Sequence, residues 1–181
     1  AHSKEEIKEL AKEARAITSE FGVLLCINDH VHIALQCKVD ACHLGKKDMP
    51  IASAKALTQG KLLIGATCNT IEDVYSAYEA GADYIGLGPY RFTTIKQKLS
   101  PELGISGYQS ISDQMKSKNI NIPLVAIGGI QVEDVKALIN TGVAGIAVSG
   151  ALIHSNNWKA TRQSFQSELQ TNKQNTHVTN S

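Results

Sequence analysis

Two acidic positions early in the chain have the spacing of a shared cation site. Asn28 and Asp29 follow the apolar run Val23 to Ile27, and Asp48 follows a second run, Ala41 to Leu44. Neighbouring parallel strands lie about 4.8 Å apart, so carboxylates that follow adjacent strands can reach one ion. Oxygen ligands without cysteine or histidine partners favour Mg²⁺ held partly by substrate phosphates. The alternative interpretation is a helix N-cap at each aspartate.

Three histidines, His30, His32 and His43, lie near these aspartates in the sequence. Their spacing does not match a zinc motif. We therefore expect them to pack against, or support, the residues that bind a ligand.

The segment from Gly88 to Lys96, GPYRFTTIK, combines hydroxyl groups with positive charge after the apolar run Tyr84 to Leu87. Arg91 and Lys96 on one such loop would suit a phosphorylated substrate, since loops of this kind in α/β folds commonly carry function. A solvated surface loop is the alternative interpretation.

Glycines end the last two apolar runs, in AIGGI (Ala126 to Ile130) and VSGAL (Val148 to Leu152). Gly128, Gly129 and Gly150 would let backbone N–H groups approach a phosphate at the start of a helix. Tight turns, which also need glycine, are the alternative.

The elements that must position these residues are short apolar strands, which we expect to be buried on both faces, separated by helices. Ser3 and Glu6 form a capping-box pattern, so the chain opens with an amphipathic helix. A later helix begins after Thr70 and ends at Gly81, and no hairpin signal interrupts the alternation. The predicted strands are Val23 to Ile27, Ala41 to Leu44, Leu62 to Gly65, Tyr84 to Leu87, Leu124 to Ile127 and Gly145 to Ser149.

Alternating strands and helices predict an α/β fold with a parallel sheet. No GxGxxG motif follows the first strand, which argues against a dinucleotide fold. Polar residues at the carboxyl end of nearly every strand instead favour a (β/α)8 TIM barrel, with six of its eight strands readable. We expect one domain over residues 1–170 and a polar, disordered tail over 171–181.

Composition sets the class of protein. The chain has 181 residues, 43% of them hydrophobic, with 18 Lys and Arg against 17 Asp and Glu. This apolar content and the net charge of +1 disfavour a disordered chain. The near-neutral charge also disfavours a nucleic-acid partner, which requires a basic surface. The mean hydropathy of −0.12 disfavours a membrane span. The four cysteines form no CxxC pair and no signal peptide is visible, so we expect a cytoplasmic protein.

The motifs taken together resemble the thiamine phosphate synthase family. They are INDHVHIAL with HLGKKD, then IGATCNT, GADYIGLGPYRFTTIK, LSPELG, IPLVAIGGI and GIAVSGALI, in the family's order from about Lys4 to Ile153. The resemblance implies a (β/α)8 barrel that couples hydroxymethylpyrimidine diphosphate to a carboxylated thiazole phosphate, giving thiamine phosphate, diphosphate and CO2. The implied partners are these small molecules, and a homodimer is compatible.

The resemblance also implies roles for individual residues. Asn28, Thr67 and Lys96 would bind the diphosphate, with Lys96 also catalytic, and Asp29 and Asp48 would bind Mg²⁺. Thr93, Gly129, Ser149 and Gly150 would bind the thiazole phosphate. In such a site, Mg²⁺ and lysine stabilise the negative charge that grows on the departing diphosphate. The thiazole nitrogen then attacks the benzylic-type carbon of the pyrimidine substrate from which the diphosphate has left.

Two departures from the family stand out. Two βα units that precede the opening helix in the family, the second ending in a Gln-Leu-Arg-x-Lys motif, have no match here, so we expect the front of the barrel to be missing from this sequence. Ile95 stands where the family usually has a threonine in the loop that binds the thiazole phosphate. This departure leaves open the identity of the second substrate and the affinity for it. A thiazole tautomerase-like isomerase and a non-catalytic phosphate-binding barrel are the alternative functions.

Overall fold

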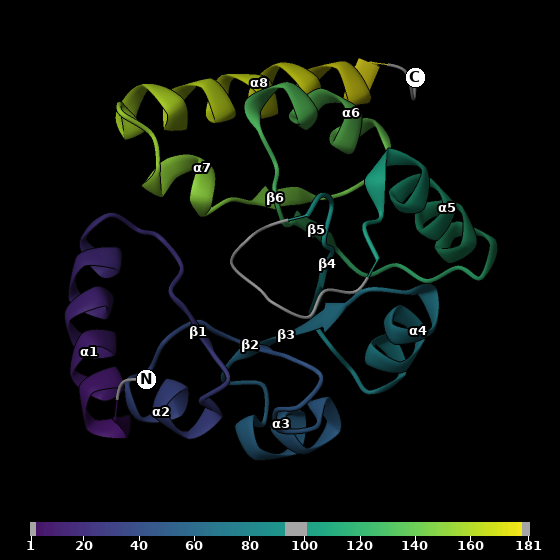
Figure 1. Cartoon of the computed structure of the whole chain (residues 1–181). Helices are drawn as coiled ribbons and strands as arrows, with labels where there is room; N and C mark the ends of the chain where they lie inside the picture. Colours follow the sequence, from purple (N-terminus) through teal and green to yellow (C-terminus); the bar gives the residue numbers. More distant parts are fainter. Residues whose placement is uncertain (1–2, 93–100, 179–181) are drawn as a thin grey trace. The chain divides into compact units, whose positions relative to one another are not determined.

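The computed structural model describes residues 3–92 and 101–178. Its strands are β1 (Cys26–Asn28), β2 (Ala41–Leu44), β3 (Leu63–Cys68), β4 (Tyr84–Leu87), β5 (Leu124–Ile127) and β6 (Gly145–Ala147). Figure 1 labels these strands, and within the described ranges their order in the sheet is β1-β2-β3-β4-β5-β6. β1 pairs with β2, β2 with β3, and β5 with β6, each in parallel. The predicted α/β fold with a parallel sheet is therefore confirmed, while the closed eight-stranded barrel stays a prediction.

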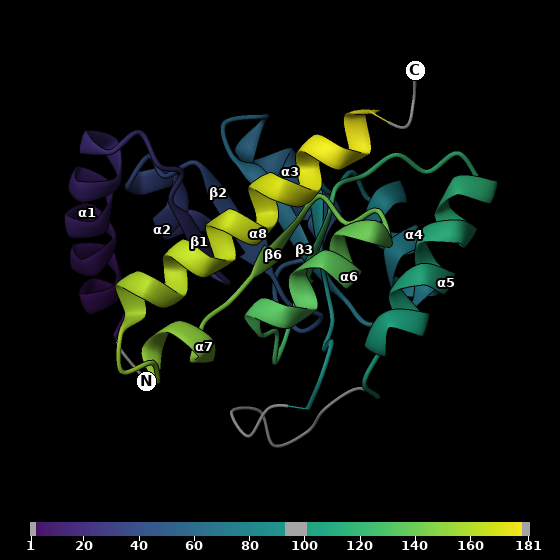
Figure 2. The same cartoon turned by 90° about the horizontal axis from the view of Figure 1, so that it is seen from above.

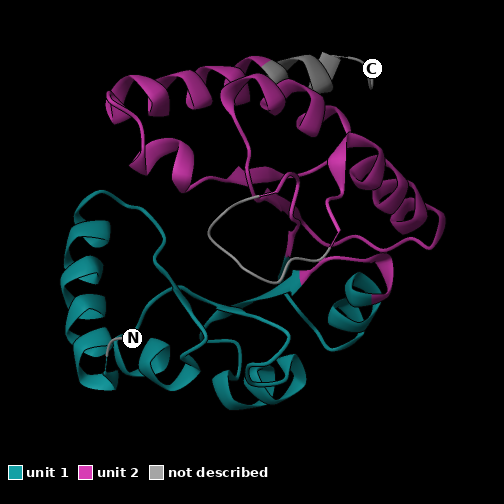
Figure 3. Ribbon diagram, viewed as in Figure 1, with its two compact units in different colours: residues 1–67, 73–85 teal, residues 68–72, 86–181 magenta. Residues whose placement is uncertain are grey.

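Helices fill the connections between the strands. They are α1 (Lys4–Glu20), α2 (Val31–Gln36), α3 (Ile51–Thr58), α4 (Ile71–Glu79), α5 (Gly104–Ser117), the 3-10 helix η1 (Val132–Asp134), α6 (Val135–Asn140), α7 (Gly150–Ile153) and α8 (Trp158–Val178). The chain divides into two compact units (Figure 3). Unit 1 comprises residues 1–67 and 73–85, and unit 2 comprises residues 68–72 and 86–181. Among the described residues, no helix has the length and apolar character to cross a membrane.

The first helix starts at the predicted capping box. Oγ of Ser3 accepts a hydrogen bond from the backbone N of Glu6 at 3.2 Å, and the Glu6 carboxylate accepts one from the backbone N of Ser3 at 2.6 Å. These two bonds satisfy backbone donors that the first helical turn leaves without partners. The predicted N-terminal helix is confirmed.

The core of unit 1 lies on one face of its strands. The alternation of side chains along β2 sends Cys42 and Leu44 into this core and His43 to the opposite face. The buried cluster is made by Val31, Ala34, Val39, Cys42, Leu44, Ala54, Leu62 and Ile64. One face of β1–β3 is therefore packed by helical residues, and the other carries polar side chains.

In unit 2, α6 and α8 lie side by side (Figures 1 and 2). Val135, Leu138 and Ile139 of α6 are buried, as is Phe165 of α8. Tyr108 of α5 is fully buried, and its hydroxyl donates to the backbone oxygen of Leu87 at the end of β4. The same hydroxyl accepts from the backbone N of Ile127, at 3.3 Å. One buried side chain thus links α5 to the ends of β4 and β5.

The first strand is shorter than predicted. We expected Val23 to Ile27 to be buried on both faces, but Val23 and Leu24 are 56% and 69% exposed and precede the strand. Among the described residues, β1 pairs with β2 alone, through Cys26–Asn28, so Val23 and Leu24 lie outside the paired stretch. The apolar run overstated both the length and the burial of this strand.

The last helix, α8, overlaps the predicted tail. Its backbone continues to Val178, into the segment that we expected to be a tail without regular structure. The sequence QTNKQNTHV contains no glycine or proline, the residues that most reliably end a helix. Polar composition alone therefore did not mark the end of α8.

Candidate active site

The ends of β1, β2 and β3 carry four of the predicted site residues within unit 1. Asn28 is the last residue of β1, Asp29 follows it, and Asp48 lies in the turn after β2. Thr67 is in the last part of β3. The strand register aligns Asn28 with His43, and His43 with Gly65 two residues before Thr67. The structure therefore brings these residues to one end of three adjacent strands.

Asp29 adopts a backbone conformation that few side chains tolerate. Its φ is 68°, in the left-handed region where aspartate and asparagine are enriched. Its backbone N donates to the carbonyl oxygen of His43 at 2.9 Å, which ties it to β2. The strand end therefore fixes the position from which the Asp29 carboxylate extends.

Asp48 closes a tight turn on Gly45. Oδ2 of Asp48 accepts from the backbone N of Gly45 at 2.7 Å, and the backbone N of Asp48 donates to the carbonyl oxygen of Gly45 at 3.1 Å. A Cβ added to Gly45 would lie 2.9 Å from Oδ2 of Asp48. Glycine therefore allows the close approach that orients this carboxylate.

The carboxylates of Asp29 and Asp48 act on a common neighbour. Burial raises the pKa of the Cys42 thiol to about 12, and the charges of Cys26, Asp29 and Asp48 add to that rise. Both carboxylates thus lie within electrostatic reach of β2. Among the described residues, no group of three or more His, Cys, Asp or Glu could hold a metal. This two-carboxylate donor set fits Mg²⁺ that takes its other ligands from phosphate and water.

His43 connects Thr67 to a tyrosine that the sequence analysis did not single out. Nε2 of His43 lies 2.9 Å from Oγ1 of Thr67, and Nδ1 lies 3.2 Å from the hydroxyl of Tyr84. The same hydroxyl lies 3.4 Å from Sγ of Cys26. Burial raises the pKa of Tyr84, so the phenol stays protonated. Glycine inside a strand often marks a place where another group approaches the backbone closely. Gly65 of β3, against which the Tyr84 ring packs, is therefore the one signal of this contact in the sequence.

The predicted phosphate-binding residues of unit 2 also lie at neighbouring strand ends. Ile127 of β5 pairs with Ala147 of β6, so Gly129 and Ser149, each two residues further on, follow adjacent strands. Gly129 has a φ of 69°, which favours glycine. The carbonyl oxygen of Ser149 accepts from the backbone N of Leu152 at 2.9 Å, and Gly150 begins α7. Backbone groups of both strand ends are thus brought together.

Arg91, which the sequence suggested as a phosphate ligand, is paired with a carboxylate in the structure. Its guanidinium forms two hydrogen bonds with the Asp134 carboxylate, Nη1 to Oδ2 at 2.9 Å and Nη2 to Oδ1 at 2.8 Å. Burial acts to raise the pKa of Asp134, but hydrogen bonds from Arg91, the Gln131 backbone and Tyr90 outweigh it and lower that pKa. A loop arginine can pair with a carboxylate distant in the sequence, and the loop sequence alone does not reveal that partner.

Two predicted site residues, Thr93 and Lys96, lie outside the described residues, as does Ile95. The described residues before this segment form hydrogen bonds with those after it. The backbone N of Phe92 donates to the Glu102 carboxylate at 2.6 Å, and the backbone N of Leu103 donates to the oxygen of Pro89 at 2.9 Å.

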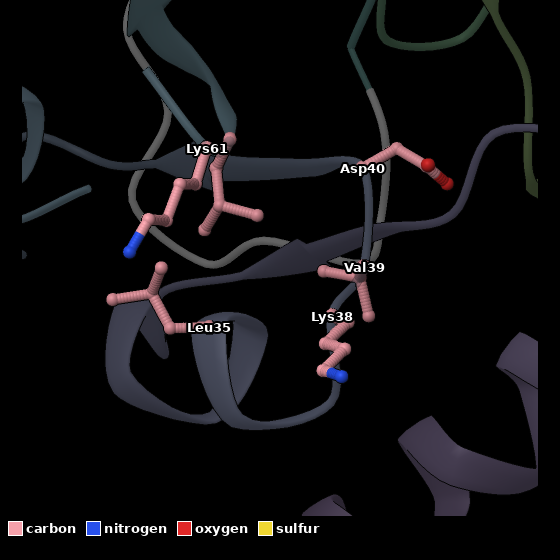
Figure 4. Close-up of a pocket in the computed structure, with 6 residues that line it drawn as sticks. Leu35, Lys38, Val39, Asp40 and Lys61 are labelled. Carbon is pink, nitrogen blue, oxygen red and sulfur yellow. The ribbon is translucent and has the colours of Figure 1, made fainter. Parts of the chain in front are cut away.

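A pocket of about 320 Å³ lies elsewhere in unit 1. It is lined by Leu35, Lys38, Val39, Asp40, Lys61 and Leu62 (Figure 4). Asp40 and Leu62 directly precede β2 and β3, so the pocket is at the opposite strand ends from the predicted site residues. The ammonium groups of its two lysines do not point toward one another, and Asp40 pairs with Arg15 at 2.5 Å. We do not assign this pocket to the candidate active site.

Comparison with known proteins identifies close relatives. A family model described as thiamine monophosphate synthase matches residues 1–152. A thiamine-phosphate synthase of Bacteroides thetaiotaomicron is 50% identical over 83% of this chain and 72% of that protein. One of Phocaeicola vulgatus is 46% identical over 83% and 73%. Among solved structures, a thiamine phosphate pyrophosphorylase from Pyrococcus furiosus superposes with a TM-score of 0.83 at 30% identity, covering 94% of this chain and 79% of that one.

Proposed function

The chain belongs to the thiamine monophosphate synthase family, and we propose that it acts as a transferase that forms thiamine phosphate. The substrates would be hydroxymethylpyrimidine diphosphate and a carboxylated thiazole phosphate, and the other products diphosphate and CO2. The observation that carries this proposal is the 50% identity to a thiamine-phosphate synthase over 83% of the chain. The grouping of Asn28, Asp29, Asp48 and Thr67 at adjacent strand ends supports it.

We propose that the six strands belong to a (β/α)8 barrel. Their strictly sequential order supports this, since a doubly wound sheet reverses its strand order at a switch point. The likeness to the Pyrococcus furiosus enzyme supports it as well. In such a barrel, residues at the carboxyl ends of the strands form the active site.

The residues of unit 1 would bind the diphosphate substrate. Asn28 and Thr67 offer an amide and a hydroxyl, and Asp29 and Asp48 would hold Mg²⁺ together with the diphosphate oxygens. When bound, Mg²⁺ supplies positive charge that stabilises diphosphate as a leaving group. Lys96 would donate a charged hydrogen bond to the same group as the bond to carbon breaks. The electron-rich pyrimidine can carry the resulting positive charge until the thiazole nitrogen attacks.

The residues of unit 2 would bind the second substrate. Backbone N–H groups at Gly129 and Gly150, with the hydroxyls of Ser149 and Thr93, would bind the phosphate monoester of the thiazole. This phosphate does not react, so its binding energy serves to place the thiazole nitrogen. No protein nucleophile is needed for this reaction.

We also propose a cytoplasmic location, with small molecules as the partners and a homodimer as the assembly. The four cysteines are free thiols, two of them buried, which is usual in a reducing compartment.

An assay on the full-length protein tests the proposed reaction. Thiamine phosphate is measured with both substrates present and with each one omitted. Product that requires both substrates supports the proposal. Absence of product, with the tautomer of the carboxythiazole phosphate changing instead, would show an isomerase. If neither reaction occurs but Mg²⁺ with diphosphate raises the Tm, the barrel only binds its ligands.

A further inference from the structure

Arg91 holds both carbonyl groups of the glycine pair that follows β5. The backbone N of Arg91 donates to the oxygen of Gly128 at 3.0 Å, and Nη1 of Arg91 donates to the oxygen of Gly129 at 2.9 Å. In a planar trans peptide, the C=O and N–H groups point in opposite directions. The N–H groups of Gly129 and Ile130 therefore point away from Arg91.

The glycines make this arrangement sterically possible. A Cβ on Gly129 would lie 3.0 Å from Cβ of Arg91, and one on Gly128 would lie 2.9 Å from Cα of Pro89. Both glycines have positive φ values, 99° and 69°. The 89–91 segment is thus packed closely against the turn and fixes the direction of its peptide groups.

Asp134 in turn holds Arg91. Its side chain is only 8% exposed, and besides the two bonds from Arg91 it accepts from the Tyr90 hydroxyl at 3.1 Å and from the Gln131 backbone N at 2.8 Å. A carboxylate buried with this many donors has one orientation. Arg91 is therefore committed to Asp134 and to the Gly129 carbonyl, which makes it a poor candidate for a direct phosphate ligand.

We propose that Arg91 and Asp134 are positioning residues, which orient the backbone N–H groups of Gly129 and Ile130 toward the phosphate of the thiazole substrate. This inference rests on the proposed function, because that function supplies the phosphate monoester. It assigns a role to two side chains that make no contact with the substrate. It also explains why a turn bearing two glycines needs an arginine beside it: the arginine restricts backbone freedom that the glycines would otherwise retain.

Steady-state kinetics of Arg91→Gln and Asp134→Asn in the full-length enzyme test the inference. The KM for the thiazole phosphate should rise about tenfold, the effect of losing a charge-assisted hydrogen bond, while the KM for the pyrimidine diphosphate stays the same. Arg91→Lys, which keeps one donor, should give an intermediate KM. Asp83→Asn is the matched control, because Asp83 also accepts from a cation, Lys55, and from a backbone N, that of Ile64. It should change neither KM.

A second measurement covers the case in which the variants fold poorly. Inorganic phosphate is titrated into the wild-type enzyme while the amide NMR signals of Gly129 and Ile130 are followed, and both signals should shift. Absence of these shifts, or a wild-type KM for thiazole phosphate in Arg91→Gln, would overturn the inference. An equal rise in both KM values would also overturn it, since that indicates general structural damage. A wild-type enzyme that binds phosphate at these amides but forms no thiamine phosphate would contradict the proposed function and leave the positioning role supported.

Discussion

Nε2 of His43 lies 2.9 Å from Oγ1 of Thr67, while the other nitrogen of the same ring lies 3.2 Å from the hydroxyl of Tyr84. A histidine held at both nitrogens has a fixed ring orientation, and the partner on one side selects the tautomer on the other. The Thr67 hydroxyl is therefore oriented by a chain of side chains on one face of the unit 1 strands. These contacts give His43 a specific role, which is to orient the hydroxyl of Thr67, a predicted diphosphate ligand.

Replacement of His43 by alanine should weaken binding of the diphosphate substrate. Without its partner the Thr67 hydroxyl can rotate, and the loss of one oriented hydrogen bond should raise the KM for the pyrimidine diphosphate about fivefold. His32→Ala is the matched control, since His32 is exposed on α2 close by in sequence. Steady-state kinetics of the two variants provide the comparison. Equal KM values would contradict a positioning role for His43.

Gly65 should be essential for the placement of Tyr84. A Cβ at this position would lie 2.1 Å from Cζ of Tyr84, so Gly65→Ala must displace the ring. We expect a loss of about 1–3 kcal/mol in the free energy of unfolding, as for other overpacked sites. Gly145→Ala is the control, because nothing lies within 4 Å of a Cβ built there. Chemical denaturation that gives both variants the same stability would show that the ring accommodates the methyl group without cost.

The pair of Arg91 and Asp134 should make stability depend on pH in the acid range. The folded-state pKa of Asp134 is lowered from 3.8, so its ionised form stabilises the fold above about pH 4, and this contribution is lost as the pH falls through the lowered value. The Tm difference between wild type and Asp134→Asn should therefore be largest near neutral pH and shrink below about pH 4. Thermal melts at a series of pH values measure this difference. A difference that stays constant into the acid range would show that the charge of Asp134 contributes nothing.

Much of the fold could be predicted from the sequence. Strands such as Ala41–Leu44 and Leu124–Ile127 have the predicted bounds, because a short apolar run bounded by turn residues has few alternatives. The exposed Val23 and Leu24 could not be predicted in the same way. Burial depends on which strands lie on each side, and an apolar run contains no information about its neighbours.

The sequence predicted the site residues that follow strands. It did not predict the side-chain contacts that hold other residues around them. Asp29 follows β1 directly, and Asp48 and Gly129 lie in the segments that follow β2 and β5, so strand order places them. The Arg91 partner, Asp134, is 43 residues away in the sequence, and Tyr84 is 41 residues from His43. Such contacts arise from tertiary packing and have no local pattern. The roles of Thr93 and Lys96 stay predictions.

We propose that the Asp29 carboxylate takes part in Mg²⁺-assisted departure of diphosphate. The most direct test measures the rate of diphosphate release with both substrates and saturating Mg²⁺, for wild type, Asp29→Ala and Asp113→Ala. Asp113 is an exposed carboxylate on α5 and serves as the control. We predict a loss of about 10²- to 10³-fold for Asp29→Ala, the usual effect of removing one electrostatic contact, and a wild-type rate for Asp113→Ala. Release of diphosphate by Asp29→Ala at the wild-type rate would contradict the account.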